Sequence, residues 1–339
     1  MAQPKQQRID PKTVPAPKAG SAKSAGTGKS GRPGGRPPGA PKVRKARFGD
    51  WIAGARPQTL ALSIAPVALG TGVAYLLTHF DGGPGWHWLR ALACLAVAVC
   101  LQIGVNFAND YSDGVRGTDK HRVGPARLTG SGMARPRTVL AVALVFFALA
   151  AAAGIIIVVR TEYWWLLAVG AVAFLAGWFY TGGKRPYGYA GLGELVAFLF
   201  FGLVATVGTT YVLSGEFPLD SWITGAAVGF LAAAALLVNN LRDREQDILA
   251  GKRTLAVLIG DRASRILFAV LVLLPFGVLA YYTLLFEYAG YVYFALLAAV
   301  PAAVITILAK TPAEFIIALR LTVLTSLAFG LGLGAAIAF

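Results

Sequence analysis

The chain has 339 residues, of which 56% are hydrophobic and only 14% are charged, and its net charge is +15. A soluble domain carries about 25% charged residues, so this composition excludes an ordinary soluble protein and indicates an integral membrane protein. Thirteen of the 31 Lys and Arg residues lie in residues 1–56, and most of the others lie in short segments between apolar runs. This distribution argues against a nucleic-acid surface and is typical of a charge bias between two sides of a membrane.

The N-terminal segment, residues 1–46, is rich in Pro, Gly, Ala, Lys and Ser and lacks apolar periodicity. We therefore expect a disordered basic cytoplasmic tail, followed by one membrane domain over residues 47–339. No apolar segment with a small-residue cleavage site precedes the first apolar run, so no signal peptide is expected. The tail is expected either to be solvated or to lie near anionic lipid.

Nine hydrophobic runs follow the tail, each about 20 residues long and so able to cross a bilayer as a helix. They cover residues 58–79, 88–109, 138–159, 163–181, 193–213, 221–241, 265–286, 290–309 and 318–339. The residues before the first run and the segments after the second, fourth, sixth and eighth runs, together with Arg265 and Arg320 near the starts of the following runs, hold 29 of the 31 Lys and Arg residues. The positive-inside rule therefore predicts an all-α polytopic protein with nine transmembrane helices, a cytoplasmic N-terminus and an outside C-terminus.

The first acidic cluster stands at the end of the second run and holds Asn106, Asn109, Asp110 and Asp113. On a helix, Asn106, Asp110 and Asp113 fall at i, i+4 and i+7, which places them on one face. Ionisable residues at the edge of a membrane segment are costly, and they mark a functional site by default. This cluster is therefore a candidate site.

The second acidic cluster stands at the end of the sixth run and holds Asn239, Asp243 and Asp247. These residues fall at i, i+4 and i+8, which again predicts one helix face. The charge bias places both clusters at the cytoplasmic boundary. Two facing pairs of carboxylates at one boundary predict a site for a divalent metal and a polyanion.

Basic segments containing glycine follow both clusters, and the segment after the fourth run adds further cations. The cations in question are Lys120, Arg122, Arg127, Lys184 and Lys252. Mg²⁺ is typically held by one or two carboxylates and completed by phosphate oxygens and water, while Lys and Arg neutralise the remaining phosphate charge. The ligand that fits a membrane site is a prenyl diphosphate. Its metal-assisted ionisation would let an electron-rich nucleophile attack the allylic carbon.

Other interpretations of the same charges stay open. The acids and cations could be solvated and paired with each other, or they could serve an ion-coupled transporter. Transporters usually place their site near the bilayer midplane at broken helices, whereas these acids lie at helix ends beside cations suited to phosphate. The dense D-x-x-D-G-x-x-A-R motif of a phosphatidyl-type alcohol transferase is absent.

The two acidic clusters and their basic segments resemble the UbiA superfamily of intramembrane prenyltransferases, over essentially all of residues 50–339. The resemblance implies nine helices around a central cavity, with Mg²⁺ and a prenyl diphosphate bound by two Asp-rich motifs. The first motif in many members is N-D-x-x-D-x-x-x-D, which Asn109, Asp110 and Asp113 match. Gly117 stands at the last position, and Asp119 is the candidate substitute ligand.

The resemblance also assigns roles to individual residues. The implied catalytic Mg²⁺ ligands are Asp110, Asp113, Asp243 and Asp247. The implied orienting or substrate-contacting amides are Asn106, Asn109 and Asn239. The implied diphosphate-binding cations are Lys120, Arg122, Arg127, Lys184 and Lys252. Arg56 is a candidate for binding the carboxylate of an aromatic acid, with simple cytoplasmic anchoring as the alternative.

Within the superfamily, the segments Ala55–Pro57, Arg122–Leu128 and Gly251–Val257 look like the branch that acts on 1,4-dihydroxy-2-naphthoate. This likeness implies transfer of a polyprenyl chain to that ring with decarboxylation, giving demethylmenaquinone in menaquinone biosynthesis at the bacterial plasma membrane. Hydroxybenzoate and homogentisate stay as alternative acceptors. No residue stands out as a general base, and Glu194 is interpreted as an acid that stabilises a helix N-terminus.

Overall fold

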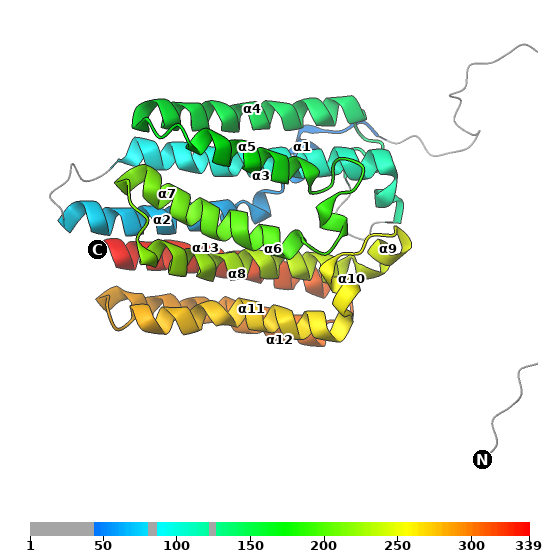
Figure 1. Cartoon of the computed structure of the whole chain (residues 1–339). Helices are drawn as coiled ribbons and strands as arrows, with labels where there is room; N and C mark the ends of the chain where they lie inside the picture. The colour runs from blue at the N-terminus through cyan, green and yellow to red at the C-terminus, as the bar shows by residue number, and fades with distance from the viewer. Residues whose placement is uncertain (1–43, 81–86, 122–126) are drawn as a thin grey trace, which may run out of the picture. The chain divides into compact units, whose positions relative to one another are not determined.

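A computed structural model describes residues 44–80, 87–121 and 127–339, and these parts of the chain are helical, without a β-strand among them (Figure 1). The predicted tail therefore lies outside the described residues, apart from residues 44–46. The elements of the first half are α1 (Phe48–Ala55), η2 (Pro57–Thr59), α2 (Ala61–Phe80), α3 (Trp88–Arg116), η3 (Thr118–His121), α4 (Pro136–Thr161) and α5 (Leu166–Phe179).

The second half begins with one continuous helical rod made of α6 (Gly193–Phe198), the π-helix η5 (Leu199–Val204) and α7 (Ala205–Ser214). A short 3-10 helix, η4 (Tyr187–Tyr189), precedes it. The remaining elements are α8 (Leu219–Arg242), α9 (Arg244–Leu249), α10 (Leu255–Ile259), α11 (Asp261–Tyr282), η6 (Glu287–Ala295), α12 (Leu296–Leu308) and α13 (Pro312–Ala338).

Each of the nine predicted apolar runs is helical, which confirms the all-α prediction. Among the described residues, 8 helices are long and apolar enough to cross a membrane. The exception is the fourth run, where α5 has only 14 residues and so a length of about 21 Å, less than the hydrocarbon core of a bilayer. The protein is a multi-pass membrane protein in which α5 is shorter than predicted.

Small residues let α2 and α13 pack backbone against backbone. A Cβ built on Gly72 would lie 2.1 Å from the carbonyl oxygen of Gly334, and one built on Gly330 would lie 2.6 Å from the Cβ of Ala65. In a membrane, where lipid is as apolar as Leu, such close approach is a main source of helix association. These glycines therefore hold the C-terminal helix against the first span.

A second close contact joins η5 to α8. A Cβ on Gly202 would lie 2.4 Å from the Cα of Gly229, so neither position tolerates a larger side chain without separating the two helices. α6, which leads into η5, also packs along α8. The contact therefore fixes the start of α6 beside the C-terminal half of α8, where the second acidic cluster follows.

α8 is the central helix of the bundle, with 72% of its most apolar window buried, whereas only 28% of the corresponding window of α4 is buried. α4 exposes large apolar side chains, among them Leu144, Val145, Ile155 and Ile156. Exposed apolar side chains of this kind suit a helix in contact with lipid.

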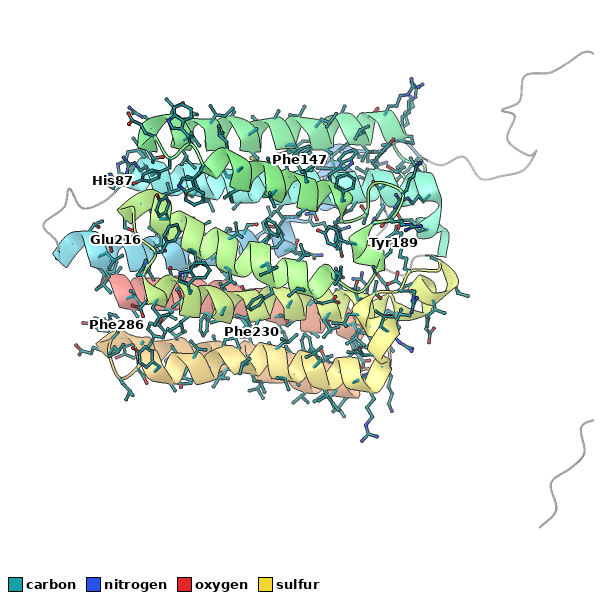
Figure 2. All side chains as sticks on the ribbon, viewed as in Figure 1. His87, Phe147, Tyr189, Glu216, Phe230 and Phe286 are labelled. Atoms are coloured by element: carbon teal, nitrogen blue, oxygen red, sulfur yellow. The ribbon has the colours of Figure 1, made fainter. Side chains whose placement is uncertain are left out.

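The two acidic clusters lie at the same end of the bundle. The C-terminal end of α3, the junction of α8 and α9, and α10 are together at the right of Figure 1, whereas the C-terminus of α13 lies at the other end. In Figure 2, Tyr189 marks the first end, and His87 and Glu216 mark the second. The prediction that both clusters share one membrane boundary agrees with this arrangement.

Candidate active site

The first acidic cluster lies on α3 itself and not in the loop that follows. α3 continues to Arg116 and ends at Gly117, whose φ of 75° is the left-handed conformation common at helix C-termini. Asn106, Asp110 and Asp113 therefore occupy one continuous helix, as the spacing predicts.

Asp110 anchors the chain segment that returns to α3. Its carboxylate oxygens accept hydrogen bonds from the backbone N–H of Leu128 at 2.9 Å and of Thr129 at 2.8 Å. Hydrogen bonds from backbone N–H groups to a carboxylate are charge-assisted and strong. Asp110 thus holds Arg127 close to α3, and its predicted role as a metal ligand stays a prediction.

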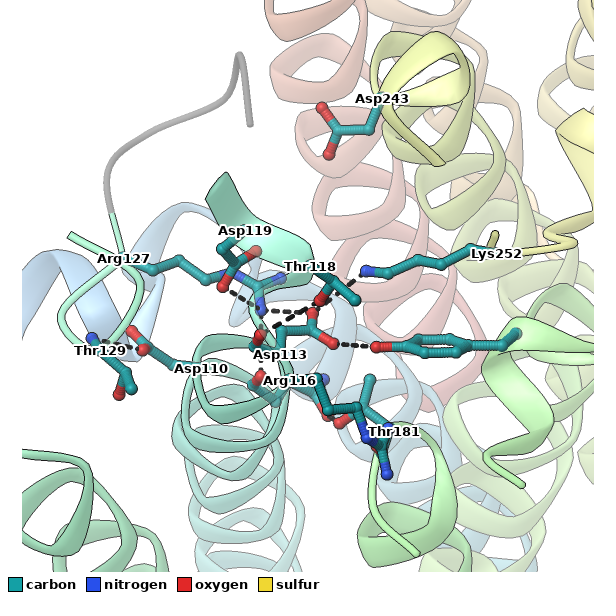
Figure 3. A network of polar contacts seen from close by, with 12 residues as sticks. Asp110, Asp113, Arg116, Thr118, Asp119, Arg127, Thr129, Thr181, Asp243 and Lys252 are labelled. Carbon is teal, nitrogen blue, oxygen red and sulfur yellow. Dashed lines mark hydrogen bonds and ion pairs between the residues drawn. The ribbon is translucent and has the colours of Figure 1, made fainter. Parts of the chain in front are cut away.

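Asp113 is the centre of a buried polar network (Figure 3). Its side chain is 2% exposed, and its Oδ2 lies 2.6 Å from Nη1 of Arg127 and 3.4 Å from Nζ of Lys252. The hydroxyl of Tyr189 donates to Oδ1. A buried carboxylate needs such partners, because an uncompensated charge in the interior is strongly destabilising.

Lys252 connects the two halves of the chain. It is 139 residues from Asp113 in sequence, yet its ammonium group also lies 4.0 Å from Oδ1 of Asp247 and 4.7 Å from the centre of the Tyr189 ring. One ammonium group therefore bridges a carboxylate from each acidic cluster, with an aromatic face beside it.

The second acidic cluster departs from the predicted continuous helix. α8 ends at Arg242 and α9 begins at Arg244, with Asp243 between them. The backbone N–H of Asp243 still donates to the carbonyl oxygen of Asn239 at 3.2 Å, and that of Asp247 donates to Asp243 at 2.9 Å. The i→i+4 hydrogen bonds continue across the junction, although the cluster is divided between two helices.

Asp243 and Asp247 have different environments. Arg242 contacts both carboxylate oxygens of Asp243, through Nε at 2.8 Å and Nη2 at 2.6 Å. Asp247 is buried, and its Oδ2 accepts a hydrogen bond from Thr254 at 3.4 Å. Burial raises the pKa of Asp247 to about 6, and the carboxylates of Asp243 and Asp113 act in the same direction against Lys252.

Arg127 gathers further predicted residues around Asp113. Its Nη1 lies 3.5 Å from Oδ2 of Asp119 and donates to the carbonyl oxygen of Asn109 at 3.0 Å. The side-chain oxygen of Asn109 accepts a hydrogen bond from Thr181 at 2.6 Å. Asp119 is therefore brought into the cluster through an ion pair, and its role as a substitute metal ligand stays a prediction.

Asn106 places Arg56 near the site. The side-chain amide of Asn106 donates to the carbonyl oxygen of Ala55 at 3.0 Å, which ties the end of α1 to α3. Arg56 follows with φ 56°, an uncommon conformation for a residue with a Cβ. Strained conformations of this kind are often found at functional sites.

Some predicted residues are not brought into this network. Lys184 is exposed and forms no ion pair with the acidic clusters among the described residues. Asn239 contributes its backbone carbonyl to the α8–α9 junction. Arg122 and the side chain of Lys120 lie outside the described residues.

Three residues of the network, Tyr189, Arg116 and Thr181, are not indicated by the sequence motifs. Arg116 donates to the backbone carbonyls of Thr181 and Gly183, and its guanidinium lies 5.6 Å from the centre of the Tyr189 ring. The Tyr189 ring thus lies near the cations Arg116 and Lys252, and its hydroxyl donates a hydrogen bond to Asp113. Its position in an aromatic and glycine-rich segment next to basic residues is the signal that could have suggested it.

The donor set fits a hard cation that shares its coordination with a phosphate ligand. No three Asp, Glu, His or Cys side chains in the described parts of the chain are gathered closely enough to hold a metal by themselves. Instead, Asp113 and Asp247 face one another across the Lys252 ammonium. Mg²⁺ commonly takes one or two carboxylates and completes its shell with phosphate oxygens and water, which suits this arrangement.

Comparison with known proteins gives a consistent result. The model of the "UbiA prenyltransferase family" matches residues 63–315. A protein of Mycobacterium tuberculosis named 1,4-dihydroxy-2-naphthoate octaprenyltransferase is 47% identical over 240 residues, covering 71% of this chain and 80% of the relative. A protein of the same name from Escherichia coli is 36% identical over 222 residues, covering 63% of this chain and 70% of the relative.

Solved structures share the fold. A UbiA homologue from Aeropyrum pernix superposes with a TM-score of 0.62 at 15% identity, covering 79% of this chain and 96% of that one. A UbiA homologue from Archaeoglobus fulgidus, described as bound to GPP and Mg²⁺, superposes with a TM-score of 0.57 at 19% identity, covering 85% of this chain and 99% of that one.

Proposed function

The chain belongs to the UbiA prenyltransferase family, and we propose that it transfers a polyprenyl group from a polyprenyl diphosphate to 1,4-dihydroxy-2-naphthoate. Loss of the ring carboxylate as CO₂ completes the reaction and gives demethylmenaquinone, within menaquinone biosynthesis. The observation that carries the proposal is the similarity, over most of the chain, to enzymes named for this naphthoate substrate. Membership of a prenyltransferase family also removes the transporter alternative.

We assign Mg²⁺ ions to the carboxylates of the two acidic clusters, Asp110 and Asp113 from the first and Asp243 and Asp247 from the second, with Asp119 as a further predicted ligand. Each ion would take one or two of these carboxylates. The donor chemistry of these residues supports the assignment, as does the Mg²⁺ named for the Archaeoglobus fulgidus homologue. When bound, the ion supplies positive charge that stabilises the departing pyrophosphate.

The cations of the network are assigned to the diphosphate. Arg127 and Lys252 lie beside Asp113 and neutralise its charge in the structure. When Mg²⁺ binds the carboxylates, these two cations would be released from them. Both could then contact phosphate oxygens, Arg127 through its planar fork and Lys252 as a point charge. Lys120, Arg122 and Lys184 are proposed to extend this basic surface.

The remaining assignments concern the acceptor and the membrane. Arg56 is proposed to bind the naphthoate carboxylate before it is lost. The prenyl chain lies among apolar helices that exclude water from the allylic cation. We place the active site at the cytoplasmic side of a bacterial plasma membrane, with residues 47–339 as the prenyltransferase domain.

An acceptor screen tests the proposed function. The full chain, purified in detergent, is given a radiolabelled polyprenyl diphosphate and either 1,4-dihydroxy-2-naphthoate, 4-hydroxybenzoate or homogentisate. We expect a prenylated, decarboxylated product from the naphthoate and its loss when EDTA removes Mg²⁺. Product from another acceptor together with none from the naphthoate would overturn the proposal.

The metal assignment is tested in the same assay with Asp243→Asn, for which we expect at least a 100-fold loss of turnover. Asp261→Asn is the matched control, because Asp261 is an exposed acid on α11 that forms an ion pair with Arg265 at the surface. Near-normal activity of the Asp243 variant would contradict the metal role.

A further inference from the structure

Glu194 is a buried acid that the proposed site does not use. It is the second residue of α6 and 5% exposed. Its Oε1 accepts a hydrogen bond from the side-chain amide of Asn240 at 2.8 Å. Its Oε2 is buried and has no hydrogen-bond partner among the described residues. An unsatisfied buried carboxylate oxygen costs stability, so its retention calls for an explanation.

A structural role does not account for this arrangement. An acid in the first turn of a helix is favourable beside the positive end of the helix dipole, but this effect requires neither burial nor an unfilled oxygen. The other buried acids have compensating partners: Asp110 has two backbone N–H groups, Asp113 has Arg127 and Lys252, and Asp247 has Lys252 at 4.0 Å. In the described parts of the chain, Glu194 has no ion-pair partner within 4.0 Å.

The position of Glu194 relates it to the second acidic cluster. Asn240 precedes Asp243 by three residues on α8, which sets it about 4.5 Å further from the end of the helix. Glu194 therefore lies about one helical turn deeper in the bundle than the carboxylates assigned to the metal. When a diphosphate binds at the rim, its allylic carbon and the attacking ring belong to this deeper layer.

Tyr180 lies beside the start of α6, next to Glu194 in the chain fold. A Cβ built on Gly193 would lie 3.6 Å from the hydroxyl oxygen of Tyr180, and one on Gly188 would lie 2.7 Å from its ring, so two glycines make room for this side chain. Burial raises the pKa of the Tyr180 phenol, the Glu194 and Asp113 carboxylates act in the same direction, and Arg56 opposes them. The contact with Gly193 places the Tyr180 hydroxyl beside the start of α6, where Glu194 is the next residue.

We propose that Oε2 of Glu194 accepts the proton of the acceptor's ring hydroxyl during prenyl transfer. The assignment rests on the proposed function. Oε2, which has no hydrogen-bond partner in the described parts of the chain, would then bind the hydroxyl next to the ring carbon that is alkylated. Asn240 would hold the carboxylate in place through Oε1.

A single carboxylate can both accept and return the proton that moves during the reaction. The ring carbon bearing the carboxylate forms a C–C bond with the allylic carbon, whose C–O bond breaks with its electron pair leaving on pyrophosphate. The neighbouring O–H bond breaks, its proton passes to Glu194, and its electron pair forms a C=O bond. The C–CO₂ bond then breaks, its pair restores the aromatic ring, and the oxygen takes the proton back from Glu194. Glu194 is therefore an ionised carboxylate both before and after the reaction.

Substitutions at Glu194 separate this role from packing. Glu194→Gln keeps the size of the side chain but cannot accept the proton, whereas Glu194→Asp keeps the carboxylate and shortens the chain. General base catalysis contributes about 100-fold to 10,000-fold, so we expect kcat to fall at least 100-fold in Glu194→Gln, with the KM for prenyl diphosphate within threefold of wild type. Glu194→Asp should keep at least ten times the kcat of Glu194→Gln. A packing role predicts the opposite order.

Glu216→Gln is the matched control. Glu216 is exposed and lies at the end of the bundle opposite Tyr189 (Figure 2). We expect the Glu216→Gln variant to have the same activity as wild type. If Glu194→Gln does not fold, Glu194→Ala is assayed with added formate, and recovery of turnover is expected. A wild type without activity on the naphthoate would overturn the proposed function. An active wild type with Glu194→Gln above one third of its kcat, or with no recovery by formate, would overturn the assignment of Glu194 alone.

Discussion

Lys252 shows how single residues of the site depend on contacts distant in sequence. Its ammonium group lies between Asp113 and Asp247, which come from different acidic clusters, and beside the Tyr189 ring. The sequence identified Lys252 as a phosphate-binding cation. It could not show that, without a ligand, the same cation compensates two carboxylates, because that follows only from the approach of α3 and the α9–α10 segment.

Substitution of Lys252 tests this bridging role. Lys252→Met should lower the stability of the Mg²⁺-free protein by about 2 kcal/mol, because two facing carboxylates lose a charged partner. Added Mg²⁺ should raise the Tm of the variant more than that of wild type, and the KM for prenyl diphosphate should rise. Thermal unfolding in detergent and steady-state kinetics measure both. Lys310→Met, at an exposed lysine, is the control, and an unchanged Tm in Lys252→Met would refute the bridge.

The residues of the first cluster divide into two kinds of role that their sequence pattern does not distinguish. Asp110 and Asn106 bind backbone groups and so hold the Arg127 segment and α1 in place. Asp113 instead faces cations. The i, i+4, i+7 spacing correctly predicted one helix face. Which side chain on that face contacts backbone depends on segments that return from elsewhere in the chain.

At the scale of elements, the nine runs were predicted well, because apolar length is a local property of the sequence. The exceptions are the short helix α5 and the break at Asp243, where α8 gives way to α9. Because of this break, two helices carry the second cluster. Hydrophobicity carries no signal for it, because the residues around it are polar on both sides.

The close contact of α2 with α13 allows a test at this scale. Gly72→Ala would place a methyl group 2.1 Å from the Gly334 carbonyl oxygen, so the helices must separate, and we expect a loss of about 1–3 kcal/mol in stability. Gly277→Ala is the control, because a Cβ there meets nothing within 4 Å and the change should be neutral or stabilising. Equal Tm values for the two variants in detergent would show that the contact does not limit stability.

For the molecule as a whole, the charge bias predicts its orientation in the membrane. Glu216 lies at the end opposite the acidic clusters (Figure 2), while Lys310 lies in a segment predicted to be cytoplasmic. In a variant with Cys94 and Cys100 replaced by Ala, an impermeant maleimide should label Glu216→Cys in intact cells. Lys310→Cys should react only after the membrane is opened. The reverse pattern would show that the orientation is wrong.

The sequence by itself determined that the chain is a helical membrane protein, where its spans run, and which two segments carry acids suited to a metal and a diphosphate. These properties are local, since they depend on apolar length, helical spacing and charge along a few turns. The tertiary structure decided which acids meet which cations and that Tyr189 lies between Arg116 and Lys252. It also decided that one oxygen of Glu194 is buried without a hydrogen-bond partner from the residues that the structure describes. Those properties depend on contacts between segments far apart in the chain, which no local pattern specifies. The close approach of Gly202 on η5 to Gly229 on α8 is one example.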